Sequence, residues 1–367
     1  MTLSVGPCTN LKGSVGRGEA AVLVSEIPAL REFWYPVVYS AELTDKPHQA
    51  VLFGEEYVVW RTGDGSVHAA FDLCPHRGSR LSQGWLAGDR LVCGYHGWQY
   101  DASGRCVCIP QNDPSTPQPP RARLQPVHAD ERYEMVWICI AEEPRAPIPD
   151  LPELNDPDYV LIHEMMEVWD AAAPRVVDNA LDVSHLSFVH RGSIGDAAAP
   201  RMSDYDLERD GWNLSFTISY QSRVTEQQKA NTGITEDFIT RTTHAELVQP
   251  MVFRGVLEYP NDLRHVLYKT CAPVDDHRTL FCQFVARNDD PDDEKAQGII
   301  GVDRTVQCED RALLERMPSD FPAEVTTEVH TKGDRMTLEY RRILAELAAE
   351  AGPLRPDATW AGGRWGG

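Results

Sequence analysis

The chain has 367 residues, of which 42% are hydrophobic and 25% charged, and these are the proportions of a globular protein with a core of its own. The 56 acidic and 35 basic residues give a formal net charge of −21, which argues against a nucleic acid partner because phosphate backbones attract positive charge. No apolar run approaches the roughly 18 residues of a membrane span, and the first 20 residues lack the basic start and apolar core of a secretory signal. We therefore expect a cytoplasmic protein of about two domains, with no membrane association.

Short strands are expected in the first 150 residues. Residues 1–25 show little pattern and are interpreted as an N-terminal tail. Over residues 50–73 the runs VLF, EYVVW and VHAAF predict three strands, the last two separated by a turn at Asp64-Gly65. Two stretches with five prolines each, 110–120 and 144–157, are incompatible with helices and central strands. The second stretch predicts a domain boundary near residue 150.

The second half of the chain mixes helices with a sheet. The pattern predicts a helix over 176–190 and alternating strands over 212–287, which indicate an antiparallel sheet. Two further helices are expected over 296–317 and 333–350, before a C-terminal tail over 353–367. The predicted fold class is α+β: an all-β domain over 26–150, followed by an α+β domain over 151–352 with a central antiparallel sheet and flanking helices.

Two short clusters in the first domain each contain one cysteine and one histidine. Cys74-Pro-His76 and Cys93-Gly-Tyr-His96 are separated by 16 residues, and each spacing lets two side chains converge from one tight turn. A structural zinc site uses the same residue types, but it more often pairs Cys with Cys and His with His. A Rieske [2Fe-2S] cluster needs two Cys on one iron and two His on the other, which is the pattern found here.

A second constellation lies about a hundred residues further on. Asn179, Asp182 and His185 are spaced by three and would form one polar stripe on a helix. His190 follows His185 at five, so both imidazoles reach one metal only if the helix ends or distorts near Phe188.

An iron that activates O2 typically needs a carboxylate beside two histidines. In the helix expected over 296–317, Asp310 lies within an apolar stripe, Asp303 lies near that stripe, and Glu309 lies off it. An acid on an apolar face needs a partner, which favours Asp310, with Asp303 as the alternative.

These motifs resemble those of the Rieske non-haem iron oxygenases. Cys74-Pro-His76-Arg-Gly and Cys93-x2-His96-Gly-Trp98 are similar to their cluster loops, and Asn179-x2-Asp182-x2-His185-x4-His190 is most similar to the vanillate and dicamba O-demethylase branch. The similarity extends over about residues 33–345, and a short Asp-x4-Glu stretch, here from Asp310 to Glu315, holds the family's third iron ligand.

The resemblance implies a terminal oxygenase, an oxidoreductase that incorporates molecular oxygen. Electrons from a ferredoxin or flavin reductase would enter the cluster and leave through His76 or His96 toward a mononuclear Fe(2+) held by His185, His190 and Asp310. Asp182 would bridge an imidazole of the cluster to His185, or would only orient His185, and Asn179 would lie beside the iron. In related enzymes the cluster of one subunit serves the iron of its neighbour, which implies a homotrimer. NAD(P)H would act indirectly through a separate reductase, since the chain has no Gly-rich dinucleotide loop after a strand.

The expected substrate is an aromatic or polycyclic small molecule, largely apolar because no basic cluster is evident in the second domain. We expect monooxygenation, either hydroxylation or oxidative demethylation, with arene cis-dihydroxylation or other oxidative C–H chemistry as alternatives. A Rieske electron carrier without oxygenase activity and a zinc-stabilised β module are the rival classes. Candidate pocket residues are Phe188, Phe238, Phe253 and Phe284.

Overall fold

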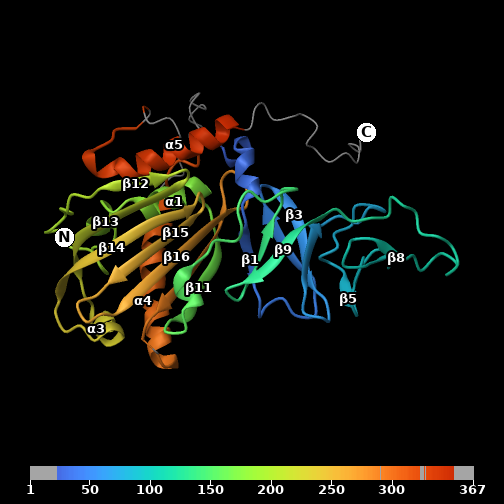
Figure 1. The fold of residues 1–367 in the computed structure, drawn as a ribbon, viewed down its shortest axis with the longest axis horizontal. Helices are drawn as coiled ribbons and strands as arrows, with labels where there is room; N and C mark the ends of the chain where they lie inside the picture. Colours follow the sequence, from blue (N-terminus) through green and yellow to red (C-terminus); the bar gives the residue numbers. More distant parts are fainter. Residues whose placement is uncertain (1–22, 290, 323–325, 327, 351–367) are drawn as a thin grey trace, which may run out of the picture.

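The computed structural model describes residues 23–289, 291–322, 326 and 328–350. Its strands form three antiparallel sheets, which lie side by side along the long axis of the molecule (Figure 1). The smallest sheet lies at one end, the six-stranded sheet in the middle and the seven-stranded sheet at the other end.

The middle sheet contains the strands expected around residues 50–73. In spatial order its strands are β1 (Tyr35–Tyr39), β10 (Met135–Cys139), β9 (Pro126–Arg132), β4 (Val67–Phe71), β3 (Glu55–Arg61) and β2 (His48–Leu52). Phe53, expected in the first of the three strands, instead lies with Gly54 in the turn between β2 and β3, with φ angles of 52° and 77°. Two successive residues of positive φ are typical of the tight turns that match strand twist.

The smallest sheet supports the two Cys/His loops. Its strands, in order, are β5 (Trp85–Ala87), β6 (Arg90–Val92), β7 (Gln99–Tyr100) and β8 (Cys106–Cys108). A buried cluster that includes Trp60, Leu81, Leu91 and Tyr100 also contains Cys74 and Cys93, so both loops are fixed to a packed core.

The seven-stranded sheet confirms the antiparallel arrangement predicted over 212–287. Its order is β11 (Val160–Trp169), β17 (Thr279–Arg287), β16 (Arg264–Pro273), β15 (Val252–Glu258), β14 (Phe238–Gln249), β13 (Asn213–Arg223) and β12 (Leu207–Asp210). From β12 to β17 each strand pairs with the next in sequence, and β11 adds to the far edge beside β17.

Helices cover this sheet. They are α1 (Ala173–Leu181), α2 (Leu186–Val189), α3 (Glu226–Thr232), α4 (Asp293–Leu314) and α5 (Arg335–Glu350), with 3-10 turns η1 (Val24–Glu26), η2 (Pro28–Glu32), η3 (Pro152–Asn155) and η5 (Lys332–Asp334). α4 and α5 confirm the two helices expected after residue 290. One buried cluster joins Phe33 and Tyr35 to Phe281 and Tyr340, so the N-terminal and C-terminal parts share a continuous core.

The helix predicted over 176–190 is interrupted earlier than expected. α1 ends at Leu181, and Asp182 is extended, with φ −80° and ψ 117°. Its side chain accepts a hydrogen bond from the backbone N–H of Ser184 at 2.7 Å, and this local bond competes with continuation of the helix. A first break therefore lies before His185, and α2 then ends at Val189, which confirms the helix end expected near Phe188. Because of the first break, the three-residue spacing from Asn179 to His185 does not form a stripe on one helix.

Candidate metal centres

The two Cys/His loops have the same backbone conformation. The N–H of Gly78 donates to Cys74 O at 2.8 Å, and the N–H of Gly97 donates to Cys93 O at 3.0 Å. Both glycines have positive φ, 70° and 72°, which a residue with a side chain rarely adopts. Each loop therefore turns back on its cysteine and presents a histidine two or three residues later.

The four side chains of these loops converge. Cys74 and Cys93 are buried, the rings of His76 and His96 are 4.5 Å apart, and His76 stacks on Trp98 at 4.4 Å. A hydrogen bond between the two thiols raises the pKa of Cys74 and lowers the pKa of Cys93. Two adjoining thiols and two adjoining imidazoles are a donor set for metal.

The residues fit a Rieske cluster. His76 Nδ1 is buried and has no hydrogen-bond partner among the residues that the structure describes, so this ring nitrogen is available to a metal. Each loop supplies one thiol and one imidazole, and the thiols lie on the buried side of the loops while both histidines are half-buried. This segregation suits a cluster with two thiolates on the inner iron and two imidazoles on the outer iron.

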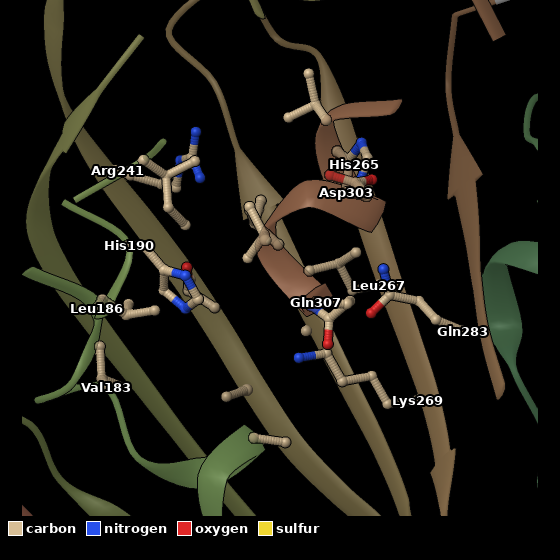
Figure 2. Close-up of a pocket in the computed structure, with 18 of the residues that line it drawn as sticks. Val183, Leu186, His190, Arg241, His265, Leu267, Lys269, Gln283, Asp303 and Gln307 are labelled. Atoms are coloured by element: carbon tan, nitrogen blue, oxygen red, sulfur yellow. The ribbon is translucent and has the colours of Figure 1, made fainter. Parts of the chain in front are cut away.

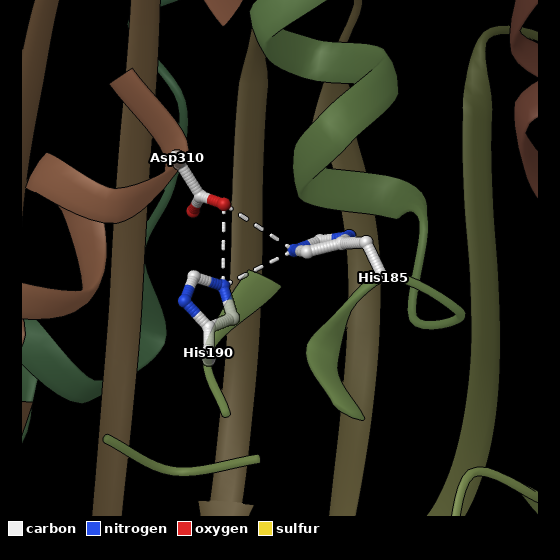
Figure 3. Close-up of side chains that lie close together, drawn as sticks. All are labelled: His185, His190 and Asp310. Atoms are coloured by element: carbon white, nitrogen blue, oxygen red, sulfur yellow. Dashed lines mark hydrogen bonds and ion pairs between the residues drawn. The ribbon is translucent and has the colours of Figure 1, made fainter. Parts of the chain in front are cut away.

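His185, His190 and Asp310 come together at a second site (Figure 3). Asp310 Oδ1 lies 3.2 Å from His190 Nε2 and 3.4 Å from His185 Nε2, and the two nitrogens are 3.2 Å apart. Two imidazole nitrogens and one carboxylate oxygen facing a common point form the donor set of the 2-His-1-carboxylate iron sites.

The interruption of the helix positions both histidines. His185 precedes α2 and His190 follows it, so the short helix spans the distance between the two rings. The chain then folds back, and the N–H of Gly195 donates to His190 O at 2.7 Å. A Cβ at Gly195 would lie 2.3 Å from Leu186 O, so only glycine permits this close return.

Acidic residues surround the two histidines. Asp182 Oδ2 lies 3.5 Å from His185 Nδ1 without a hydrogen bond between them, and Asn179 Nδ2 donates to Asp310 Oδ1 at 3.4 Å. Burial lowers the pKa of His185, but Asp182 and Asp310 outweigh it and raise this pKa to about 9. Burial also opposes ionisation of Asp310, yet the two imidazoles hold its pKa well below the usual range.

Sequence reasoning missed Glu309. Its Oε2 lies 2.9 Å from His190 Nδ1 and accepts a hydrogen bond from Ser193 Oγ at 2.6 Å. The apolar stripe excluded Glu309 because neighbouring helical residues point about 100° apart. The sequence nevertheless contained a signal, because Glu309 directly precedes the candidate ligand Asp310. An acid in that position can reach the ring nitrogen of a histidine ligand that faces away from the metal.

Two acids lie elsewhere. Asp303 Oδ2 is 3.0 Å from His265 Nε2, so the structure places Asp310 and not Asp303 against His185 and His190. Asp178 pairs with Arg341 of α5 at 3.1 Å, and its side chain is only 15% exposed because α5 packs against α1.

A cavity of about 120 Å³ opens beside His185, His190 and Asp310 (Figure 2). The sheet, α3 and α4 line it, and its size is near the ~150 Å³ that accommodates one benzene ring. Of the four phenylalanines expected there, only Phe253 lines it: Phe284 is in the core, and Phe188 and Phe238 are more than half exposed.

The cavity wall is also more basic than expected. It includes Arg241, Lys269 and Arg287, which stand on three different strands and become neighbours only when the sheet forms. A basic cluster could therefore not be recognised in the sequence.

Comparisons with known proteins match two parts of the chain. Residues 33–127 match the family model of the Rieske [2Fe-2S] domain, and residues 169–350 match that of the vanillate O-demethylase oxygenase C-terminal domain. Methylxanthine N1-demethylase NdmA of Pseudomonas putida is 31% identical over 338 residues, 90% of this chain and 92% of that protein. Its solved structure superimposes with a TM-score of 0.75 at 29% identity, covering 89% of this chain and 92% of that one. Dicamba O-demethylase of Stenotrophomonas maltophilia is 33% identical over 186 residues, 50% of this chain and 54% of that protein.

The chain belongs to the Rieske non-haem iron oxygenases. It is an oxidoreductase that uses O2, with a Rieske [2Fe-2S] cluster and a mononuclear iron as cofactors, and this confirms the expected family, fold class and chemistry. A zinc module and an electron carrier without oxygenase activity do not fit this family. No helix in the described part of the chain is long and apolar enough to cross a membrane.

Proposed function

We propose that this oxygenase removes a methyl group from nitrogen or oxygen on an aromatic or heteroaromatic small molecule. The observation that carries the proposal is the cavity: it opens beside His185, His190 and Asp310 and has room for about one ring. Relatives named for demethylation, NdmA and dicamba O-demethylase, support this outcome over ring dihydroxylation.

Seven side chains would hold the metals. Cys74 and Cys93 would bind one iron of the cluster and His76 and His96 the other, while His185, His190 and Asp310 would bind the mononuclear iron. When bound, the cluster supplies single electrons and the mononuclear iron supplies the activation of O2. Asn179 holds the Asp310 carboxylate, and the apolar part of the wall excludes water from the methyl group.

Electron delivery would cross between subunits of a homotrimer. Figure 1 shows the Cys/His loops, next to β5 and β8, at the opposite end of the molecule from α1 and α4. Within one chain the two metal sites are thus far apart, so a neighbouring copy would supply the electron. Asp182, whose side chain is 31% exposed and contacts His185, would form the bridge.

The electron donor would be a separate ferredoxin or flavin reductase that uses NAD(P)H, in the cytoplasm. We also propose the domain division near residue 150, within the proline-rich segment 144–157.

Formaldehyde release tests the proposed reaction. The iron-replete protein is supplied with NADH and a Rieske-oxygenase reductase, and caffeine and dicamba serve as probes. Demethylation predicts about one formaldehyde per O2 consumed, because the hydroxylated methyl group leaves as formaldehyde. A cis-diol product would replace demethylation by dihydroxylation. Cluster reduction without O2 consumption on any probe would contradict the proposed reaction.

A further inference from the structure

Two buried carboxyl groups meet beside the cavity. Glu164 lies on β11 and is 6% exposed, and Asp303 lies on α4 with its side chain 17% exposed. Glu164 Oε1 and Asp303 Oδ2 have no hydrogen-bond donor among the residues that the structure describes. The two carboxyl groups nevertheless lie within hydrogen-bonding reach of each other. Two carboxyl groups form a hydrogen bond only when one of them carries a proton, so this pair requires one.

The neighbours of the pair assign this proton to Glu164. Gln283 donates to Glu164 Oε2 at 2.7 Å and leaves Oε1 without a donor. Burial raises the pKa of Glu164 well above its ordinary value, and the charge of Asp303 raises it further. Burial also opposes ionisation of Asp303, but His265, 3.0 Å away, and Arg287 hold its pKa below the ordinary value. Glu164 is therefore the acid of the pair and Asp303 the carboxylate.

Further titratable and charged groups lie around the pair. They are Tyr39 on β1, Arg241 on β14, Tyr259, Lys269 on β16, Cys282 on β17 and Arg304 on α4. Lys269 lines the same cavity and forms no ion pair in the described part of the chain, so it is the alternative source of a proton there.

Asp303 connects the pair to the cavity. It lines the cavity wall, whereas Glu164 does not. Asp303 and Asp310 are seven residues apart on α4, which is about two helical turns or ~10 Å, so both lie on one face of the helix. Figure 2 shows Asp303 beside His265, across the cavity from His190. A proton that leaves Asp303 therefore enters the space beside the iron site.

Solvent reaches β11 close to Glu164. This strand is the edge of the seven-stranded sheet, and Glu167, three residues further on, has a side chain 33% exposed. Glu167 pairs with Arg304, whose Nη1 also donates to the backbone oxygen of Glu164 at 3.2 Å. The acid of the pair thus lies near solvent, while the carboxylate lies at the cavity.

We propose that Glu164 and Asp303 hold one proton between them and supply it to the cavity when O2 is reduced at the mononuclear iron. Monooxygenation of a C–H bond consumes O2, two electrons and two protons, and yields an alcohol and one water. The electrons come from the electron donor through the cluster. Glu164 passes its proton to Asp303, Asp303 releases it into the cavity, and solvent restores the proton on Glu164.

Infrared spectroscopy tests whether the pair holds a proton. At about pH 7 exposed carboxyl groups are ionised, so a carboxylic acid C=O band that shifts in D2O reports a buried acid. We expect E164Q of the iron-replete protein to lose such a band. The matched control is E167Q, which removes a more exposed acid of the same strand outside the cavity and should keep the band. A wild-type protein without this band, or an E164Q variant that keeps it, would overturn the proposal.

Reoxidation kinetics test whether the proton is used. The iron-replete protein is reduced with dithionite, freed of excess reductant and mixed with O2 and caffeine, and the absorbance of the cluster is followed. Wild-type and E167Q rates should change little between about pH 6 and pH 8. E164Q and D303N should be at least about tenfold slower at about pH 8, with rates that rise about tenfold per unit of falling pH, because protons then come directly from solvent.

The pH profile distinguishes proton supply from a structural role. Wild-type rates in E164Q, or slower rates with an unchanged pH profile, would overturn the proposal. A new pH dependence in K269M together with a flat profile in E164Q would overturn it as well, because Lys269 would then be the source of the proton.

This inference does not depend on the proposed demethylation, because cis-dihydroxylation and reduction of O2 to hydrogen peroxide also consume two protons. A pH-dependent loss of rate in E164Q without formaldehyde from any probe would support the proton supply and contradict demethylation. Formaldehyde release by E164Q at the wild-type rate and with the wild-type pH profile would overturn the proton supply and leave demethylation standing.

Discussion

Glu309 contacts a candidate iron ligand without belonging to the ligand set itself. It holds His190 Nδ1 at 2.9 Å and is itself held by Ser193, which fixes the orientation of the imidazole. Such outer partners also make the ligand nitrogen a better donor to the metal. The carboxylate is therefore expected to contribute to iron retention although sequence reasoning left it out.

Replacing Glu309 with glutamine should weaken iron binding by about 10–100-fold while leaving the [2Fe-2S] cluster intact. Competition with a chelator, followed by iron analysis, measures the loss. The control is E294Q, which removes an exposed acid from the first turn of the same helix. Equal iron retention in both variants would show that the hydrogen bond does not position His190.

Asp182 is expected to act on electron delivery. Its contact with His185 is long, and its side chain remains partly exposed, so a neighbouring subunit can reach it. D182N keeps the shape of the side chain, so we expect both metal sites of this variant to be occupied. Turnover should nevertheless fall by about 10–100-fold. Iron and sulfide analysis alongside O2 consumption measures both properties. Wild-type turnover in an iron-replete D182N would contradict the bridging role.

At the level of secondary-structure elements, the break between α1 and α2 determines the iron site. Asp182 ends the first helix, α2 is a single turn, and Gly195 brings the chain back against Leu186 and His190. The two histidines face each other because of this irregular segment and not because of a helical repeat. A change in its backbone should therefore affect metal binding as well as stability.

Gly195→Ala tests this dependence. The added Cβ would lie 2.3 Å from the backbone oxygen of Leu186. The segment from His190 to Gly195 must therefore shift, and His190 must move with it. We expect a lower Tm and loss of the mononuclear iron, with the colour of the cluster kept. Gly301→Ala is the matched control, because a Cβ at this exposed position of α4 meets nothing within 4 Å and should stabilise the helix by about 0.5–1 kcal/mol. Equal iron content in the two variants would show that the return does not position the ligand.

These elements also show what the sequence could predict. Alternation of apolar residues predicted the strands within 212–287, which are β13 to β17, but not β11 or β12. Local spacing predicted the two Cys/His loops and the pairing of His185 with His190. The helix breaks where the Asp182 side chain accepts a hydrogen bond from the backbone N–H of Ser184. The periodicity of apolar residues carries no information about such a local bond. The basic cavity wall was not visible because Arg241, Lys269 and Arg287 become neighbours only through strand pairing.

At the scale of the whole molecule, the proposed transfer of electrons between subunits follows from the separation of the two candidate metal sites within one chain. The small sheet with β5 and β8, which supports the Cys/His loops, lies at one end of the molecule, while α1 and α4 lie toward the other end (Figure 1). A monomer would then hold both cofactors and still lack an electron path. In a cyclic assembly every cluster can meet the iron site of the next subunit.

Mixed assemblies test this arrangement. H76A should lack the cluster and D310A should lack the mononuclear iron, so each variant alone should be inactive. If clusters serve neighbouring subunits, co-expression in equal amounts should restore about a quarter of the wild-type activity, since half of the clusters and half of the iron sites are intact and meet at random in a cyclic assembly. Size-exclusion chromatography of each variant provides the control for assembly. Inactive mixtures of properly assembled subunits would place the electron path within one chain, because only a path between chains can combine an intact cluster with an intact iron site from different variants.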